Sequence, residues 1–99
     1  MNIHKVKEDT TLTIELEGRL DTVSAPQLEA ELKKSVSGVE TLLFDFAKLE
    51  YLSSAGLRVL LASQKVMNRQ GEMKIKNVNS TIMDIFEVTG FSEILTIES

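Results

Sequence analysis

The sequence predicts an α/β fold with a mixed, mainly parallel sheet of about five strands and three helices, in the order ββαβαβαβ. Three observations carry this prediction. Apolar and polar residues alternate over Thr11–Glu17, and a nearly continuous apolar run fills Thr41–Phe46. Segments with the periodicity of a helix lie between these two strands and again after the second. Strands that alternate with helices need crossover connections, and crossovers produce parallel neighbours.

The N-terminal part of the chain is expected to hold a hairpin and a first helix. Asn2–Lys7 and Thr11–Glu17 form its two strands, because the second places every other residue on one apolar face. The segment Gly18–Thr22 is predicted to be a loop. Ser24 then begins a helix, and Gln27 completes the spacing of a capping box.

The second half continues the alternation of strands and helices. Thr41–Phe46 is expected to be a strand covered on both faces, because it is nearly all apolar. Ala55–Asn68 is predicted to be the central packing helix, since apolar residues occur around much of its circumference. The elements that follow are a strand over Met73–Val78, a helix capped by Asn79 or Ser80 and ended by Gly90, and a last strand over Ile94–Glu98.

Length and composition limit the classes of function. The 99 residues are expected to form one domain, 1–99, of ordinary soluble composition, with 42% apolar and 26% charged residues. A net charge of −4 with scattered basic residues argues against a nucleic-acid partner. The absence of cysteine excludes disulfides and thiolate metal sites. No apolar segment resembles a signal peptide or a membrane span, so we expect a cytoplasmic protein without membrane contact.

A pair of serines stands between an apolar strand and a helix, within Leu49–Leu60. The N-terminus of a helix favours an anion, so a serine there is a candidate for phosphorylation. The alternative is ordinary capping, in which Ser53 caps the helix and Ser54 is its first residue. Gly56 in the first turn indicates either that another molecule approaches the backbone or that the helix packs tightly on the sheet.

Independent catalysis is not expected. Asp21 and Asp45 lie towards predicted strand ends, where either carboxylate could act on the proton of Ser54 or help to hold a metal; turn chemistry and a strand-end hydrogen bond are the alternatives. The single histidine, His4, is predicted to face solvent on an edge strand. Neither a nucleophile elbow nor a phosphate-binding loop is present, and we predict no catalytic residue, metal or cofactor.

The segment Leu49–Leu61, with Leu20–Asp21 and the Gln70–Gly71 turn, resembles a STAS domain and, more narrowly, the stand-alone bacterial anti-sigma factor antagonists. The resemblance covers almost the whole chain. It implies that the unphosphorylated protein binds an anti-sigma factor, usually a serine kinase, and so frees a sigma factor. The kinase then phosphorylates one serine at the start of the second helix and the pair separates, until a phosphatase of the PP2C type restores the binding form.

Alignment with the family pattern Asp-Ser-Ser/Thr-Gly-Leu identifies the phosphorylated residue by resemblance. Gly56 and Leu57 match the end of the pattern, which places the acceptor at Ser54. Ser53 stands where many members have aspartate, and is the alternative acceptor; Ala55 stands where they have serine or threonine. The predicted partner-binding residues are Asp21, Thr22, Ser53, Ser54, Ala55, Gly56 and Arg58.

Two further expectations follow from the resemblance. Many relatives continue into a final helix where this sequence ends at Ser99, so we expect a less covered sheet edge and a monomer or weak dimer. The alternative function is a non-switching accessory subunit of a transport or sensory complex. The two serines favour the switch, because an accessory subunit needs no phosphate acceptor. A small-molecule binding module is the third possibility.

Overall fold

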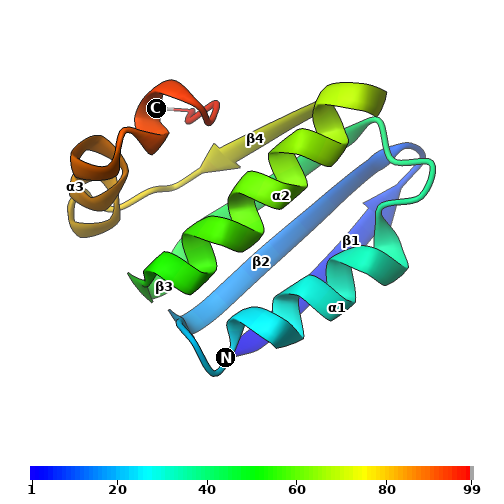
Figure 1. Cartoon of the computed structure of the whole chain (residues 1–99). Coiled ribbons are helices and arrows are strands. Elements are labelled where there is room, and N and C mark those ends of the chain that lie inside the picture. The colour runs from blue at the N-terminus through cyan, green and yellow to red at the C-terminus, as the bar shows by residue number, and fades with distance from the viewer. Residues whose placement is uncertain (99) are drawn as a thin grey trace.

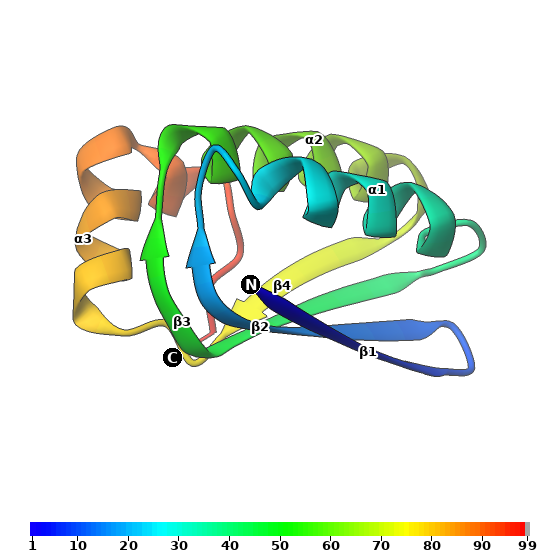
Figure 2. The same ribbon diagram turned by 90° about the horizontal axis from the view of Figure 1, so that it is seen from below.

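A mixed four-stranded sheet carries two helices on one face and a third at its curved end (Figures 1 and 2). The computed structural model describes residues 1–98. Its elements are β1 (Asn2–Glu8), β2 (Thr11–Leu20), α1 (Ala25–Ser35), β3 (Thr41–Leu52), α2 (Ser54–Gln70), β4 (Glu72–Lys76), α3 (Ser80–Thr89) and a 3₁₀ turn, η1 (Phe91–Glu93). The strands lie in the order β1-β2-β3-β4; β1 is antiparallel to β2, and the other neighbours are parallel. The predicted α/β class and mainly parallel sheet are confirmed.

The predicted last strand, Ile94–Glu98, is reduced to a single bridge on the outer edge of β4. Ile97 pairs with Ile75, whose N–H donates to the carbonyl of Thr96 at 2.9 Å. The segment starts as a helical turn, because the N–H of Leu95 bonds to the carbonyl of Phe91 and Leu95 is buried. The chain therefore covers part of the β4 edge without forming a fifth strand.

Both central strands extend beyond their predicted ends. β2 includes Gly18–Leu20, which was expected to be loop, and β3 runs six residues past Phe46 to Leu52. The pairing of β2 with β3 shifts register twice, between Glu15 and Glu17 and between Gly18 and Arg19. Such irregularities bend a strand, and Figure 2 shows both strands curving sharply towards the helical layer. The bend carries their carboxyl ends up to the helix N-termini.

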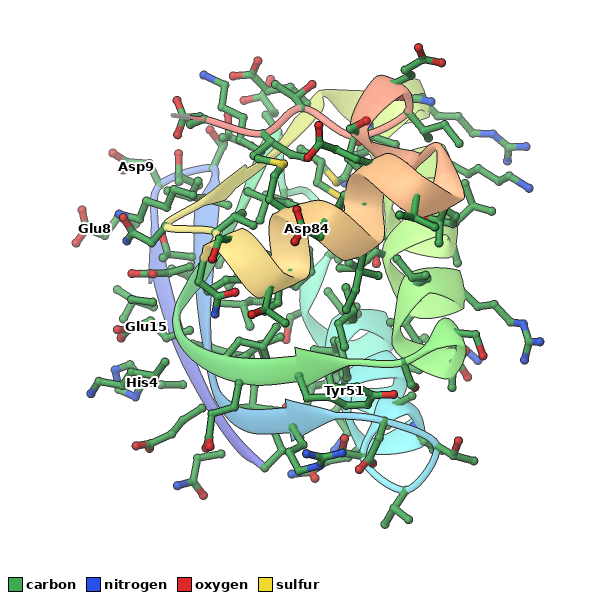
Figure 3. The ribbon with its side chains drawn as sticks, turned by 90° about the vertical axis from the view of Figure 1, so that its left-hand side faces the viewer. His4, Glu8, Asp9, Glu15, Tyr51 and Asp84 are labelled. Carbon is green, nitrogen blue, oxygen red and sulfur yellow. The ribbon has the colours of Figure 1, made fainter. Side chains whose placement is uncertain are left out.

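Only one face of the sheet is covered by helices, so the prediction that β3 is covered on both faces is wrong. Phe44 and Phe46 are fully buried, while Leu43 and Asp45, the residues that precede each of them, are half-buried. α1 and α2 are both crossovers between parallel neighbours, and one handedness places both on the same side. On the opposite, open face, His4 is exposed as predicted and lies across from Glu15 (Figure 3).

α2 is amphipathic rather than apolar all round. Its buried face consists of Gly56, Leu57, Val59, Leu60, Ser63, Gln64 and Met67. Ala62 and Val66, two of the apolar residues on which the prediction of a central packing helix was based, are exposed, with Val66 41% accessible. They line an open groove between α2 and α1. The helix runs two residues beyond its predicted end at Asn68, to Gln70, and Gly71 is its C-cap.

α3 takes the place beside β3 that β4 leaves empty, because β4 ends well before β3 does. Phe86 packs on Phe46, with ring centroids 6.5 Å apart. Asn79 caps the helix by accepting from the N–H of Ile82 at 2.9 Å, and its amide donates to the carbonyl of Leu49 on β3 at 3.1 Å. One side chain therefore caps the helix and attaches it to the strand.

Candidate functional site

The N-termini of α1 and α2 lie side by side at the carboxyl ends of β2 and β3 (Figure 1). The N–H of Ser53 donates to the carbonyl of Leu20 at 2.9 Å, which ties the two strands together where the chain leaves the sheet. Between the helices is a shallow hollow of about 200 Å³, lined by Thr22, Ala25, Pro26, Glu29, Ala55, Arg58 and Val59. The predicted partner-binding residues thus gather at one end of the fold, where parallel sheets hold their sites.

The two serines of the pair have different environments. Ser54 is exposed and is the first residue of the 17-residue α2. Ser53 occupies the N-cap position, but its hydroxyl makes no capping bond; the Oγ is buried and has no hydrogen-bond partner among the described residues. The capping alternative is therefore right about the positions of Ser53 and Ser54 and wrong about the hydrogen bond of the Ser53 hydroxyl. The first regular bond of α2 runs from the N–H of Leu57, so three earlier N–H groups of the helix remain without a helical acceptor.

Gly56 is explained by tight packing within the molecule. A Cβ at this position would lie 2.6 Å from Cδ1 of Leu52 and 2.7 Å from Cγ of Leu20. Both leucines are buried, so they have no room to move away. Of the two interpretations open at the sequence level, packing against the sheet is the one observed. The glycine lets the helix start close to the strand ends, and this sets the position of Ser54.

Asp21 organises the loop before α1. Its Oδ1 accepts from the N–H groups of Val23 and Ser24, at 3.0 and 3.2 Å. The Ser24 N–H is the main cause of a lowered pKa of the Asp21 carboxyl, with Arg19 adding a smaller effect. Ser24 does not form the predicted capping box, because its hydroxyl donates to the carbonyl of Arg19 instead. Turn chemistry, the alternative weighed for Asp21, is therefore confirmed, and no hydrogen bond joins it to Ser54 among the described residues.

Asp45 does not belong to this site. It lies seven residues before the end of β3, which corresponds to about 20 Å along the strand. Its Oδ1 accepts from the side chain of Asn77 at 2.9 Å and from the N–H of Ala47 at 3.0 Å. Burial raises the pKa of the Asp45 carboxyl, but these bonds and the nearby Lys76 outweigh it and lower the pKa overall. The longer strand removes Asp45 from the neighbourhood of Ser54.

Three residues beside the site were missed from the sequence. Val23 is 87% exposed at the tip of the loop before α1. The guanidinium of Arg19 lies 4.3 Å from the ring centroid of Tyr51, a residue near the end of β3 (Figure 3). Val23 was detectable as an apolar residue in a polar loop. The stacked pair was not, because it depends on the shifted register of β2 and β3.

The described residues provide no candidate for a metal site or a membrane-spanning helix. Residues 1–98 contain no group of three or more histidine, aspartate or glutamate side chains placed to hold a metal ion. No helix in this part of the chain has both the length and the apolarity to span a membrane. What the site offers is an exposed hydroxyl at a helix N-terminus, surrounded by a loop and a hollow of mixed polarity.

A family model described as the STAS domain matches residues 2–99. The chain belongs to the STAS domain family. A relative from Bordetella bronchiseptica, provisionally named as anti-sigma factor antagonist BtrV, is 35% identical, and the alignment covers 98% of this chain and 85% of the relative. The anti-sigma-B factor antagonist of Bacillus subtilis is 24% identical, over 100% of this chain and 92% of that protein. Both of these relatives are named as anti-sigma factor antagonists.

The STAS fold is confirmed by solved structures. The Bacillus protein SpoIIAA matches in its unphosphorylated form with a TM-score of 0.79, and in its phosphorylated form with 0.77, at 20% identity in both cases. These matches cover 99% of this chain and 88% and 92% of the SpoIIAA chains.

Proposed function

We propose that this protein is an anti-sigma factor antagonist whose unphosphorylated form binds an anti-sigma factor that is also a serine kinase, and so releases a sigma factor. Phosphorylation of Ser54 ends the interaction, and a phosphatase of the PP2C type restores it. The observation that carries the proposal is the exposed hydroxyl of Ser54 at the start of α2. The names of the relatives, one of them 35% identical, support the same class of function.

The environment of the serine pair favours Ser54 over Ser53 as the acceptor. A kinase must bring the hydroxyl into line with the γ-phosphate of ATP, which an exposed side chain permits. The Oγ of Ser53 is buried, and the backbone of this residue is held by Leu20. Phosphorylation of Ser53 would require the start of α2 to open.

The switch needs no refolding. A phosphoryl group adds about −1.5 to −2 charges at neutral pH. Three N–H groups at the start of α2 have no helical acceptor, and they can donate to the phosphate in the free protein. In the complex, the same charge would be buried against the partner without a matching cation on the partner's side. An unpaired charge at an interface costs roughly 2–5 kcal/mol, which weakens binding about 30-fold or more.

Phosphosite mapping by mass spectrometry tests the proposal. The purified protein is incubated with ATP and cytosolic extract of its own host, with Ser53→Ala and Ser54→Ala in parallel. We expect one phosphoryl group, lost only in Ser54→Ala. If no phosphorylation occurs in an extract that modifies another substrate, the switch is refuted, and a non-switching accessory subunit becomes the better account. A Ser54→Asp variant that kept full affinity for the kinase would also contradict the proposal.

A further inference from the structure

The charge of this acidic protein is distributed unevenly, and α2 is the exception. The helix carries Arg58, Lys65 and Arg69 and no acidic residue, whereas the rest of the chain has eight basic residues against fifteen acidic ones. All three basic side chains are exposed, and no carboxylate within residues 1–98 forms a salt bridge with any of them. The outer face of α2 is therefore a positive surface without internal partners.

These cations form a single stripe that begins at Ser54. Arg58, Lys65 and Arg69 are spaced by seven and four residues, so they lie on one side of the helix. Ser54 comes one turn before Arg58 and lies on the same side, within the distance at which helical side chains interact. We call Ser54, Arg58, Lys65 and Arg69 the basic stripe. It extends about 22 Å from the proposed phosphorylation site along α2.

An apolar groove between α1 and α2 runs beside the stripe. Its volume is about 120 Å³, and its lining residues are Glu29, Leu32, Lys33, Val36, Val59, Ala62, Ser63 and Val66. On the α1 rim, Glu29 and Lys33 form a salt bridge of 3.6 Å and so neutralise each other. Glu29 and Val59 also line the hollow near Ser54, so the groove and the hollow are continuous. The net charge beside the groove comes from α2 alone, and it is positive.

We propose that the groove and the basic stripe together dock an acidic amphipathic helix of the anti-sigma factor. This inference rests on the proposed function and names the surface through which it acts. The groove and hollow extend from Ala55 to Val66, about 16 Å, which matches three turns of a helix. Apolar residues of the partner would fill the groove, and its carboxylates would face the stripe. A phosphate on Ser54 would stand at one end of the stripe, where it repels an acidic helix and competes for Arg58.

An anionic membrane is the other class of partner that a basic amphipathic helix can bind. The shape of this surface disfavours it. The apolar residues form a groove between two helices rather than a ridge that could enter a lipid layer, and the acidic remainder of the protein would be repelled by anionic lipid.

The test uses the unmodified full chain labelled with ¹⁵N and a designed peptide of roughly 18 residues, with leucines along one helical face and glutamates on its flanks. Two control peptides replace every glutamate by lysine or scramble the order. We expect amide shifts to be confined to the α1 and α2 residues that line the groove and hollow. We also expect no binding of the lysine peptide, and weakened binding at higher salt.

Charge reversal then identifies the surface. The triple variant Arg58→Glu, Lys65→Glu, Arg69→Glu is expected to weaken binding of the glutamate peptide by about tenfold or more. The matched control Lys7→Glu, Lys34→Glu, Lys48→Glu makes the same change in net charge at exposed residues outside the groove, and should weaken it by less than about threefold.

Several outcomes would overturn the docking surface: no shifts, shifts centred on the open face of the sheet, equal binding of the lysine or scrambled peptide, or equal weakening by both triple variants. If the protein binds phosphatidylserine vesicles, and only the triple variant of Arg58, Lys65 and Arg69 loses this binding, the stripe is a membrane-binding surface instead. None of these measurements involves phosphorylation. If the peptide binds but Ser54 is not phosphorylated in host extract, the switch is refuted and the docking surface is retained. If Ser54 is phosphorylated but the peptide does not bind, the docking surface is refuted and the switch is retained.

Discussion

Asn79 is expected to be the most sensitive polar residue of the fold, because two elements depend on it. Its Oδ1 caps α3 at the N–H of Ile82, and its Nδ2 donates to the carbonyl of Leu49. Loss of a helix cap costs about 1 kcal/mol, and leaving a half-buried carbonyl without its donor costs roughly 1–3 kcal/mol. We expect Asn79→Ala to lower the free energy of unfolding by about 2–4 kcal/mol.

The two contributions of Asn79 can be separated. Asn79→Asp keeps an oxygen that can cap α3 but lacks the donor to Leu49, so it should lose only the second contribution. Urea denaturation followed by circular dichroism measures both variants. A change of about 2–4 kcal/mol corresponds to roughly 10–25 °C in Tm for a chain of this size.

Thr81→Ala is the control, because Thr81 is exposed on the same helix. It should change stability by less than about 0.5 kcal/mol. The reasoning is refuted if Asn79→Ala is as mild as Thr81→Ala. If Asn79→Asp destabilises as much as Asn79→Ala, the capping contribution is absent.

Two further predictions concern the connection into β4 and the loop before α1. An added Cβ in Gly71→Ala would overlap the backbone carbonyl of Glu40, so we expect a loss of about 3 kcal/mol in urea denaturation. Gly90→Ala, where a Cβ meets nothing within 4 Å but φ is +81°, should lose about 1 kcal/mol, and equal losses would contradict the steric account. Because the pKa of Asp21 is lowered in the folded protein, its carboxylate stabilises the fold above its unfolded pKa of about 3.9, and this contribution disappears as pH falls through the folded value. The stability gap between wild type and Asp21→Asn should therefore be widest near neutral pH and close as the pH falls below the lowered pKa of the folded carboxyl. A gap that does not vary with pH would contradict this account.

Features that depend on neighbours in sequence were predicted well. The alternation around Leu12, Ile14 and Leu16 placed β2 and its buried face, because side chains of a strand alternate between faces. Asn79 and Gly90 marked the ends of α3 through local backbone geometry. The position of Ser54 at the start of a helix was predictable for the same reason.

Features that depend on contacts between residues far apart in the chain were not predicted. Whether Ser53 caps α2 depends on where its hydroxyl points once the residue is tied to Leu20, and that contact spans 33 positions of the chain. Asp45 was wrongly placed near the site because the sequence did not show how far β3 extends beyond Phe46. That length is set by pairing with β2 and by packing against α3. The apolar run alone marks where a strand is buried, and not where it ends.

The sequence by itself determined the order of elements as far as α3 and the helix that begins at the serine pair, because each follows from spacing within one segment. Only the tertiary structure decided that Ser54 is exposed while the Oγ of Ser53 is buried, that Gly56 serves packing against Leu20 and Leu52, and that α1 lies alongside α2 to form a groove. The physical reason is that exposure and close contact are set by residues far apart in the chain, which the bend of β2 and β3 brings together.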